Sequence, residues 1–382
     1  MKGTWSVKTL GDLFEISRGG SPRPIQDFLT EDVDGVNWIM ISDASASGKY
    51  IERTAKRIRQ DGATRSRRVS PGDFLLTNSM SFGRPYIMKT EGCIHDGWLH
   101  LKKRDNSVDE DYFYYLLGSE TTYAKFERVA AGATVKNLNI DLVSRVEVPV
   151  PPVFEQRRIA AILDKVDSLR RKRQEAIRLA DEFLRAVFID MFGGLDTASN
   201  PKVEFADVAT LDAPMVEPTS DEFADMLHVG PDRIEKGNGR LLACETARAE
   251  RVISKKFLFD ERYVLYSKIR PALKKCALAE FRGLCSADMY PIRPSGDEVT
   301  REFIWGLLLS DAFDRHISTL PDRANIPKLN RVELNAFQFR LPSIESQRKY
   351  SSIVQRTMAL KRKHNAFLKQ AIALPASLGF FN

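Results

Sequence analysis

The chain has 382 residues, of which 43% are hydrophobic and 29% are charged, and its formal net charge is +7. This composition predicts a soluble globular protein that is long enough for two hydrophobic cores. No uninterrupted run of about 18 apolar residues is present, so we expect no membrane span, and the first residues lack the apolar core of a secretory signal.

The mild positive charge is compatible with nucleic acid as a partner, although many basic proteins bind none. The four cysteines form no Cys-x-x-Cys pair and lie beside no histidine cluster, so neither a zinc site nor a disulfide framework is expected. They are Cys93, Cys244, Cys276 and Cys285. We expect reduced cysteines in a cytoplasmic protein without a bound metal.

Residues 1–150 predict a mixed α/β domain. Short runs of β-branched and aromatic residues predict strands, and the turn residues Pro71-Gly72-Asp73 precede one of them. The expected elements are strands at 36–41, 74–76 and 146–150 and a helix that begins at Asp111.

A long helix is expected after Pro151-Pro152, because a helix can begin after proline but cannot continue backwards through it. It would run from Glu155 to Met191, about 55 Å at roughly 1.5 Å per residue, and end at Gly193-Gly194. A second long helix follows Pro342.

Both helices carry a stripe at alternating three- and four-residue spacing, which is typical of a coiled-coil seam. Two matching stripes most simply pack on each other; the alternative is that each stripe covers the core of its own domain. At this length, well above a mean of about 12 residues, we favour a helix pair. The first stripe is Ile159, Ile162, Val166, Leu169, Arg173, Ala176, Ala180, Phe183 and Val187, and the second is Ile353, Thr357, Leu360, His364, Phe367, Ala371 and Leu374.

The chain contains one unit twice. Asn139 recurs as Asn330 and Gln156 recurs as Gln347, each 191 positions later. A period this long indicates a domain duplication rather than a solenoid. The expected fold class is therefore α+β, with two mixed α/β domains in an internal duplication that are separated by two long helices. The expected segments are a first domain at 1–150, a spacer helix at 151–193, a linker at 194–202, a second domain at 203–341, a second spacer helix at 342–375 and a tail at 376–382.

This layout resembles the specificity subunit of type I restriction-modification systems over essentially the whole chain. The hinge-to-helix junction from Val148 to Ile159 is similar to that family's "PLPP-x-x-EQ-x-x-I" signature, and the segments 132–139 and 71–76 also match its habits. The second junction, 341–348, is degenerate, with one proline and a glutamate shifted by one position.

The resemblance implies specific roles. Each domain would be a target-recognition domain that reads one half of a bipartite DNA sequence. The helices would form an antiparallel coiled coil that sets the spacing and docks two adenine methyltransferase subunits, and restriction subunits could join. The chain itself would not be a catalyst and would bind no cofactor; S-adenosylmethionine is expected in the partner methyltransferase.

Candidate DNA contacts come from basic runs and polar loops. Seven basic residues lie between Arg53 and Arg68 against only Asp61. Such side chains neutralise phosphates, and arginine also binds guanine edges; the alternative is a solvated charged face. The candidates in the first domain are Arg53, Lys56, Arg57, Arg59, Arg65, Arg67, Arg68, Asn78, Ser79, Ser81, Arg84, Lys136 and Asn137.

The second domain offers a different set of candidates. Its loop after the matching strand differs completely in sequence from that of the first domain, which implies two different half-sites and an asymmetric target. The candidates there are Arg248, Arg251, Lys255, Lys256, Lys268, Arg270, Lys274, Lys275, Arg323, Asn325 and Lys328.

Enzyme functions fit less well. The prolines at 151–152 and 201 do not complete the Asp/Asn-Pro-Pro-aromatic loop of an adenine methyltransferase, and Pro321-Asp322 with Glu333 lacks the lysine of a nuclease core. A metal or acid–base pair at His95 and His100 is a weaker alternative to ordinary polar histidines. The rival functions are a nuclease or methyltransferase fragment with unrecognised chemistry and a two-headed protein-binding scaffold.

Overall fold

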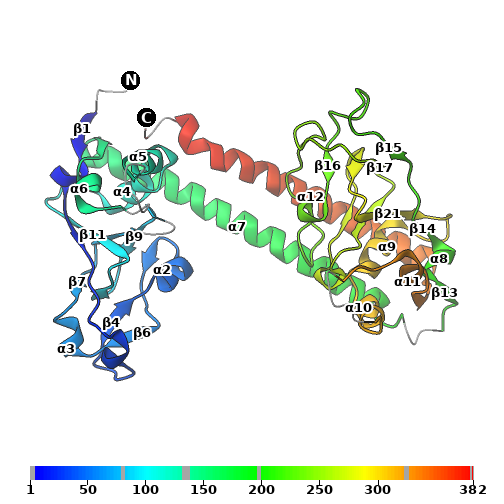
Figure 1. The fold of residues 1–382 in the computed structure, drawn as a ribbon, viewed down its shortest axis with the longest axis horizontal. Coiled ribbons are helices and arrows are strands. Elements are labelled where there is room, and N and C mark those ends of the chain that lie inside the picture. The colour runs from blue at the N-terminus through cyan, green and yellow to red at the C-terminus, as the bar shows by residue number, and fades with distance from the viewer. Residues whose placement is uncertain are drawn as a thin grey trace. The chain divides into compact units, whose positions relative to one another are not determined.

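The computed structural model describes residues 5–78, 82–130, 138–195, 199–321, 327–378 and 381. They fall into two compact units (Figure 1). Unit 1 consists of Met1–Lys172 and Leu368–Asn382, and unit 2 of Arg173–Phe367. Among the described residues, no helix is both long enough and apolar enough to cross a membrane.

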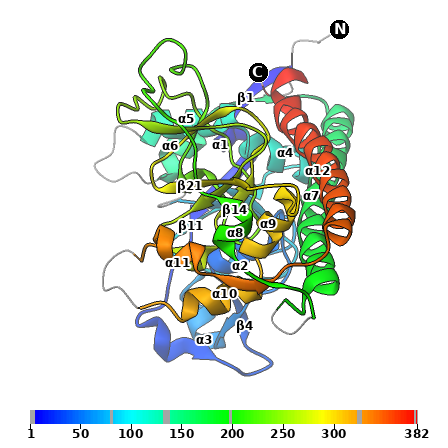
Figure 2. The same cartoon turned by 90° about the vertical axis from the view of Figure 1, so that its right-hand side faces the viewer.

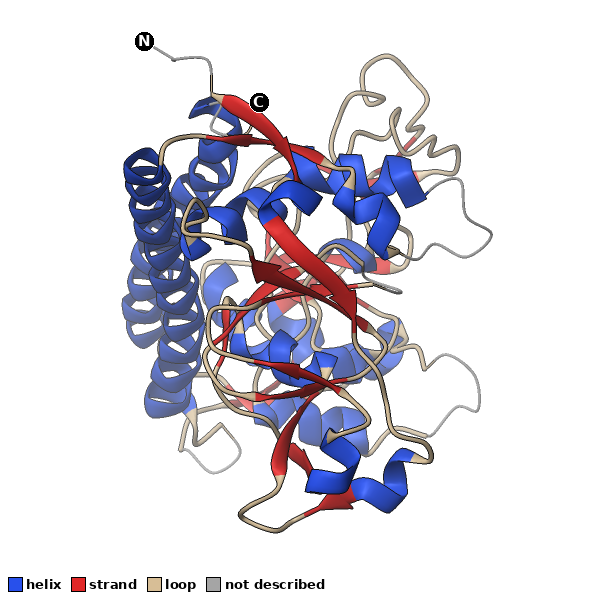
Figure 3. Cartoon of the chain, turned by 90° about the vertical axis from the view of Figure 1, so that its left-hand side faces the viewer, coloured by secondary structure: helices blue, strands red, loops and turns tan. Residues whose placement is uncertain are grey.

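Unit 1 is built on two five-stranded sheets (Figure 3). Neighbouring strands are antiparallel except for the pairs β5–β9 and β4–β10. The first sheet has the order β2 (Phe14–Arg18), β11 (Trp98–Lys103), β8 (Phe74–Thr77), β9 (Pro85–Met88), β5 (Tyr50–Ile51). The second has the order β3 (Leu29–Thr30), β6 (Lys56–Ile58), β4 (Val36–Ile39), β10 (Gly92–Ile94), β7 (Arg67–Val69).

The predicted elements of the first domain are present with shifts of one or two residues. Every residue of β8 is buried, and the preceding turn places Gly72 at a φ of 90°, which glycine adopts without strain. Short and long helices cover the sheets. They are α1 (Leu10–Leu13), α2 (Ile41–Ser47), α3 (Gln60–Ala63), α4 (Glu110–Leu117), α5 (Glu120–Ala130) and α6 (Ile140–Ser144).

Unit 2 repeats this order and confirms the duplication. From β9 onward, each element of unit 1 begins 191 residues before its counterpart. The counterparts are β19 (Cys276–Leu278), β20 (Gly283–Cys285), β21 (Met289–Pro294), α9 (Arg301–Leu308), α10 (Asp311–Ser318), α11 (Arg331–Asn335) and β22 (Gln338–Arg340). The sheets have the orders β14 (Ala209–Thr210), β21, β18 (Val264–Ser267), β19 and β15 (Met215–Val216), β17 (Lys256–Phe259), β20, β16 (His228–Val229).

A two-stranded hinge leads into each long helix. In unit 1, β1 (Ser6–Thr9) pairs antiparallel with β12 (Glu147–Val150), and α7 (Val153–Phe192) begins after the two prolines. In unit 2, β13 (Lys202–Glu204) pairs with β22, and α12 (Ile344–Leu378) follows. The hinge therefore fixes where the chain leaves the sheet region and where the helix starts.

A buried glutamine closes each hinge. Gln156 and Gln347 are both 0% exposed. The Gln156 side chain donates to Ser107 O and Pro151 O, both at 2.8 Å, and accepts from Asp109 N at 2.8 Å. Gln347 makes the equivalent bonds to Glu298 O, Pro342 O and Thr300 N. The recurring glutamine of the two junctions thus joins the hinge, the first helical turn and the loop before α4 or α9.

A buried lysine attaches α7 to unit 1. Lys49 Nζ lies 2.8 Å from Asp111 Oδ1 and 2.7 Å from Asp164 Oδ1 of α7, and 4.8 Å from the ring centroid of Tyr115. Tyr115 also donates its hydroxyl to Asp164 at 2.7 Å. Removing one partner of such a buried pair leaves an uncompensated charge, so the helix cannot easily shift against the domain.

The two long helices pair antiparallel inside unit 2 (Figure 2). Arg173 contacts His364 and the ring of Phe367, Asp181 contacts Lys361, and Phe188 packs against Tyr350. Residue numbers rise along α7 as they fall along α12, which is the antiparallel arrangement that we expected.

The register of the predicted stripe needs a correction. Leu169, Phe183 and Leu360 are 38%, 50% and 52% exposed, whereas Leu184 and Phe188 of α7 are buried. Leu184 and Phe188 join the core of unit 2, and Ile159 joins that of unit 1. Each helix therefore covers the core of its adjacent domain as well as its partner helix. Ile162, Val166, Ala176, Ile353 and Phe367 are half-buried, and the side chain of Leu374 lies outside the description.

Candidate nucleic-acid interface

Several loops of unit 1 meet at one end of its sheets. We define edge 1 as the described residues of 18–23, 64–67, 78–84 and 95–97. Asn78 N donates to Gly97 O at 3.1 Å, and Ser66 Oγ donates to Gly20 O at 2.7 Å and to Ile94 O at 3.1 Å. Strand register explains the meeting, because Arg67 lies opposite Ile94 and places residue 66 beside the β10–β11 turn.

The basic run of unit 1 divides into two groups. Arg65, Arg67 and Arg68 are exposed at or beside edge 1, and among the residues that the structure describes they have no ion-pair partner. Arg65 lies over the Phe28 ring at 5.3 Å, and Arg68 donates to Gln60 Oε1 at 3.3 Å. These three cations are available to an external anion.

The other members of the run differ in how they are engaged. Arg59 forms a double hydrogen bond with Asp61 at 3.1 and 2.9 Å, which holds the pKa of that carboxyl below its usual value. Arg57 donates to the backbone of residues 32 and 33. Arg53, Lys56 and Arg84 are exposed.

Two predicted DNA contacts are corrected because their side chains are buried. Asn78 is 2% exposed, and its amide donates to Asp96 O at 2.9 Å. Lys256 is also buried, and its ammonium donates to Ser254 O at 2.9 Å and Ser254 Oγ at 2.6 Å. Burial lowers the pKa of Lys256. Both residues hold their loops from within. The predicted residues Ser79, Ser81, Lys136, Asn137, Arg323 and Asn325 lie outside the described residues.

Unit 2 brings its counterparts together in the same way. We define edge 2 as the described residues of 251–256, 268–275, 286–288 and 327–330. Leu329 N donates to Lys268 O at 2.8 Å, just as Leu138 N donates to Asn78 O in unit 1. Arg270 N donates to Pro327 O at 2.8 Å, and Lys328 Nζ lies 3.4 Å from Asp288 Oδ1. Edge 2 thus gathers Lys268, Arg270 and Lys328, which are far apart in the sequence.

The chemistry of the two edges is different. At edge 2, Lys268 Nζ lies 5.4 Å from the ring centroid of Tyr290, whose hydroxyl donates to Leu329 O at 3.1 Å. Arg251 and Arg270 are exposed and have left-handed φ values of 54° and 49°, which non-glycine residues seldom adopt. The other predicted cations have partners within unit 2: Arg248 with Asp225, Lys255 with Glu217, Lys274 with Asp314 and Lys275 with Pro231 O.

The histidines of unit 1 make separate structural contacts. His95 Nδ1 accepts from Gly97 N at 3.0 Å, and burial lowers the His95 pKa. His100 lies on β11 with its Nε2 2.9 Å from Asp73 Oδ2. No group of three His, Cys, Asp or Glu side chains among the described residues could hold a metal ion. This arrangement offers no support for a catalytic pair.

Sequence reasoning missed one segment of edge 1, the loop that follows β2. It contains Arg18 and Arg23, both exposed, on either side of Gly19, Gly20 and Ser21. The signal that could have found it is the pair of glycines between two arginines, which suits close backbone packing of a basic loop.

Changing Arg65, Arg67 and Arg68 to alanine is expected to weaken DNA binding and flatten its salt dependence. Each lost phosphate contact should reduce the slope of log K against log salt by about 0.9. The matched control changes Arg170, Arg171 and Arg178 to alanine. These are also exposed arginines, but each is paired to a carboxylate of α7. Equal slopes for the two triple variants, measured by a salt titration, would show that the run is only a solvated face.

Comparison with known proteins gives consistent relatives. Residues 2–179, just under half of the chain, match the model of the type I restriction modification DNA specificity domain. The chain is 24% identical over 288 residues to the type I restriction enzyme EcoDI specificity subunit of Escherichia coli, covering 66% of this chain and 63% of that protein. It is 30% identical over 194 residues to the MjaIX specificity subunit of Methanocaldococcus jannaschii, covering 49% of this chain and 44% of that protein.

The fold has a counterpart among solved structures. The S subunit of a type I restriction-modification system from M. genitalium superposes with a TM-score of 0.58 at 15% identity, covering 98% of this chain and 94% of that chain. At that identity the likeness concerns the fold alone. The alignments with the two curated relatives span less than two thirds of those proteins.

Proposed function

The chain belongs to the family of type I restriction-modification specificity subunits, and from that membership we propose that it is the non-catalytic DNA-recognition subunit of a type I complex. Each unit would read one half of a bipartite DNA sequence through its own edge. The observation that carries this proposal is the pair of equivalent edges. Both are basic, both are built from the same elements, and they present different side chains.

The difference between the edges supports an asymmetric target. Edge 1 presents arginines, whose forked guanidinium suits guanine edges and phosphates. Edge 2 combines Lys268, Arg270 and Lys328 with the ring of Tyr290. Loops of different chemistry on equivalent scaffolds would select different bases, so the two half-sites would not be copies of each other.

We propose that the helix pair sets the distance between the half-sites. Helix α7 is continuous over 40 residues, and its side chains enter both hydrophobic cores, Ile159 in unit 1 and Leu184 in unit 2. Gln156 and Gln347 fix the start of each helix to its own hinge. These attachments are what a spacer needs, because a loosely held helix could not transmit its length.

The exposed apolar surface of the helices supports docking of partner subunits. Leu179 and Phe183 lie one turn apart on α7 and are both about half exposed, as is Leu360 of α12. Apolar side chains gathered on a surface mark interaction sites. We propose that two adenine methyltransferase subunits dock on the helices and that restriction subunits can join. S-adenosylmethionine would be bound by the methyltransferase.

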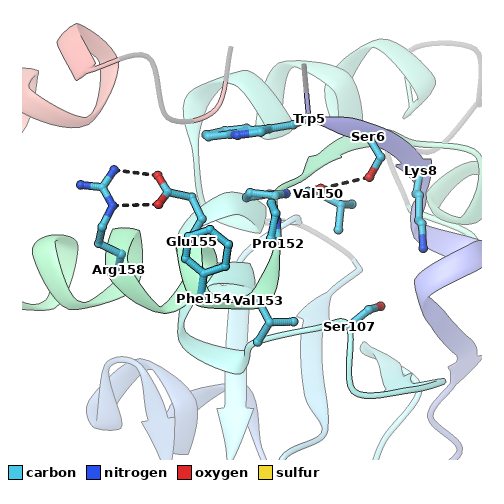
Figure 4. Close-up of a pocket in the computed structure, with 11 residues that line it drawn as sticks. Trp5, Ser6, Lys8, Ser107, Val150, Pro152, Val153, Phe154, Glu155 and Arg158 are labelled. Atoms are coloured by element: carbon cyan, nitrogen blue, oxygen red, sulfur yellow. Dashed lines mark hydrogen bonds and ion pairs between the residues drawn. The ribbon is translucent and has the colours of Figure 1, made fainter. Parts of the chain in front are cut away.

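A pocket at the hinge of unit 1 extends this surface (Figure 4). It has a volume of about 730 Å³ and is lined by Trp5, Val150, Pro151, Pro152 and Phe154 among others. Phe154 is 73% exposed, and Glu155 beside it is paired with Arg158. An aromatic side chain in open solvent beside a rigid proline hinge is a suitable anchor for a partner subunit.

The proposal is tested by reconstitution. The purified chain alone is expected to transfer no methyl groups, and the chain with a methyltransferase subunit is expected to direct adenine methylation to one DNA sequence. A variant with Leu179→Ser and Phe183→Ser should keep DNA binding and lose methylation. Methyl transfer or metal-dependent cleavage by the isolated chain would favour an enzyme fragment, and the absence of salt-dependent DNA affinity would favour a protein-binding scaffold.

A further inference from the structure

The loop after β2 is packed into the centre of edge 1. Gly19 N donates to Trp98 O at 3.0 Å, and Gly20 N donates to Ile94 O at 3.1 Å. Ser21 Oγ donates to Asp96 Oδ1 at 2.9 Å. The loop therefore touches the β10–β11 turn along its whole length, and Ser66 joins it to the segment that carries Arg65.

Close packing makes the loop rigid. A Cβ atom on Gly19 would lie 2.0 Å from His95 O, so no larger residue fits there without moving the backbone. The absence of a side chain lets the loop lie directly against the turn. Arg18 and Arg23, on either side of this packed segment, are consequently held at fixed positions on the exposed side of the edge.

The guanidinium of Arg18 is oriented by the protein. Its Nε donates to Asp96 O at 3.1 Å. In the described parts of the chain, neither Nη nitrogen has a hydrogen-bond or ion-pair partner. An arginine fixed at Nε keeps the two Nη groups available for a pair of acceptors, either the O6 and N7 atoms of guanine or two oxygens of a phosphate.

Unit 2 lacks an equivalent loop. The residues that follow β14 are Leu211, Asp212, Ala213 and Pro214, which contain one acidic and no basic residue. The duplicated scaffold therefore carries a rigid basic loop in one copy and not in the other. Such a difference cannot serve the shared framework, and it is located where the edges differ in chemistry.

We propose that the loop from Arg18 to Arg23 is a further DNA-contact segment of unit 1, in which Arg18 presents its two Nη groups to an acceptor pair on the DNA. This inference rests on the proposed function and deepens it. Unit 1 would contact its half-site through three segments, 18–23, 64–67 and the loop after β8, whereas unit 2 would do so without the first.

The test compares Arg18→Ala and Arg23→Ala with Arg104→Ala in the full chain. Arg104 is a matched control, because it is exposed and its Nε also donates to a backbone carbonyl, Gly11 O at 2.9 Å. It follows the far end of β11, where Lys103 pairs with Phe14, whereas Arg18 pairs with Leu99 at the near end. Equal unfolding midpoints for all three variants establish that the fold is intact.

Arg18→Ala is expected to weaken DNA binding about tenfold, within the range of a good bidentate contact. A loss confined to one G·C position of one half-site identifies a base contact. A uniform loss with a salt slope lower by about 0.9 identifies a phosphate contact. Affinity and methylation sites equal to those of Arg104→Ala would overturn the inference while leaving the proposed function intact. A parent chain without salt-dependent DNA affinity would instead refute the proposed function.

Discussion

Replacing Gln156 with leucine is expected to lower the free energy of unfolding of unit 1 by about 3 kcal/mol or more. The buried amide makes three hydrogen bonds, and its removal leaves Ser107 O, Pro151 O and Asp109 N without partners. Each buried backbone group left unsatisfied costs about 1–3 kcal/mol. Denaturant unfolding of the full chain, followed by a probe in each unit, measures the loss.

Gln174→Leu is the matched control for this prediction. Gln174 lies on the same helix and is exposed, so its replacement should change stability by no more than about 0.5 kcal/mol. Gln347→Leu should destabilise unit 2 as Gln156→Leu destabilises unit 1, because its bonds are equivalent. A Gln156→Leu protein as stable as the Gln174→Leu protein would mean that the glutamine does not hold the hinge.

Lengthening both long helices is expected to widen the gap between the recognised half-sites. We would insert four residues after Lys172 in α7 and four after Phe367 in α12, where the chain passes between the compact units. Helix α7 would grow by about 6 Å and turn by about 1.1 turns. At roughly 3.4 Å per base-pair step, the gap should grow by one to two base pairs while the half-sites stay the same.

Methylation-site mapping of the reconstituted complex measures this gap. The control inserts the same four residues after Gly296, in an exposed turn of unit 2 where a Cβ atom added to the glycine would meet no described atom within 4 Å. That insertion should leave both the half-sites and the gap unchanged. An unchanged gap in the protein with longer helices would show that the helices do not determine the spacing.

The architecture was predictable because the duplication supplies its own check. A strand at 74–76, a helix near Asp111 and a long helix after Pro152 were each supported by a counterpart 191 residues later, and all are present. Hydrophobic spacing was less reliable for the helix register. Phe183 and Leu184 are adjacent and both apolar, and only the shape of the domain core determines which of them is buried.

The site was predictable only in part. Runs of cations revealed Arg65 and Arg67, but the sequence does not show that Lys256 bonds to Ser254 or that Asn78 bonds to Asp96 O. These bonds depend on strand register, which brings distant segments together. Arg18 was missed because it stands alone in the sequence and has no basic counterpart in the second copy.

One contact between the long helices has a consequence for the origin of the two copies. Arg173 touches His364, which stands 191 residues later and is its own counterpart in the repeat. If two identical single-copy chains associated in this way, one side chain would have to meet a replica of itself there, and two arginines would repel each other. Fusion into one polypeptide removes that constraint. The copies were then free to differ at this point, and the cation of one now lies 4.8 Å from the ring of Phe367 in the other.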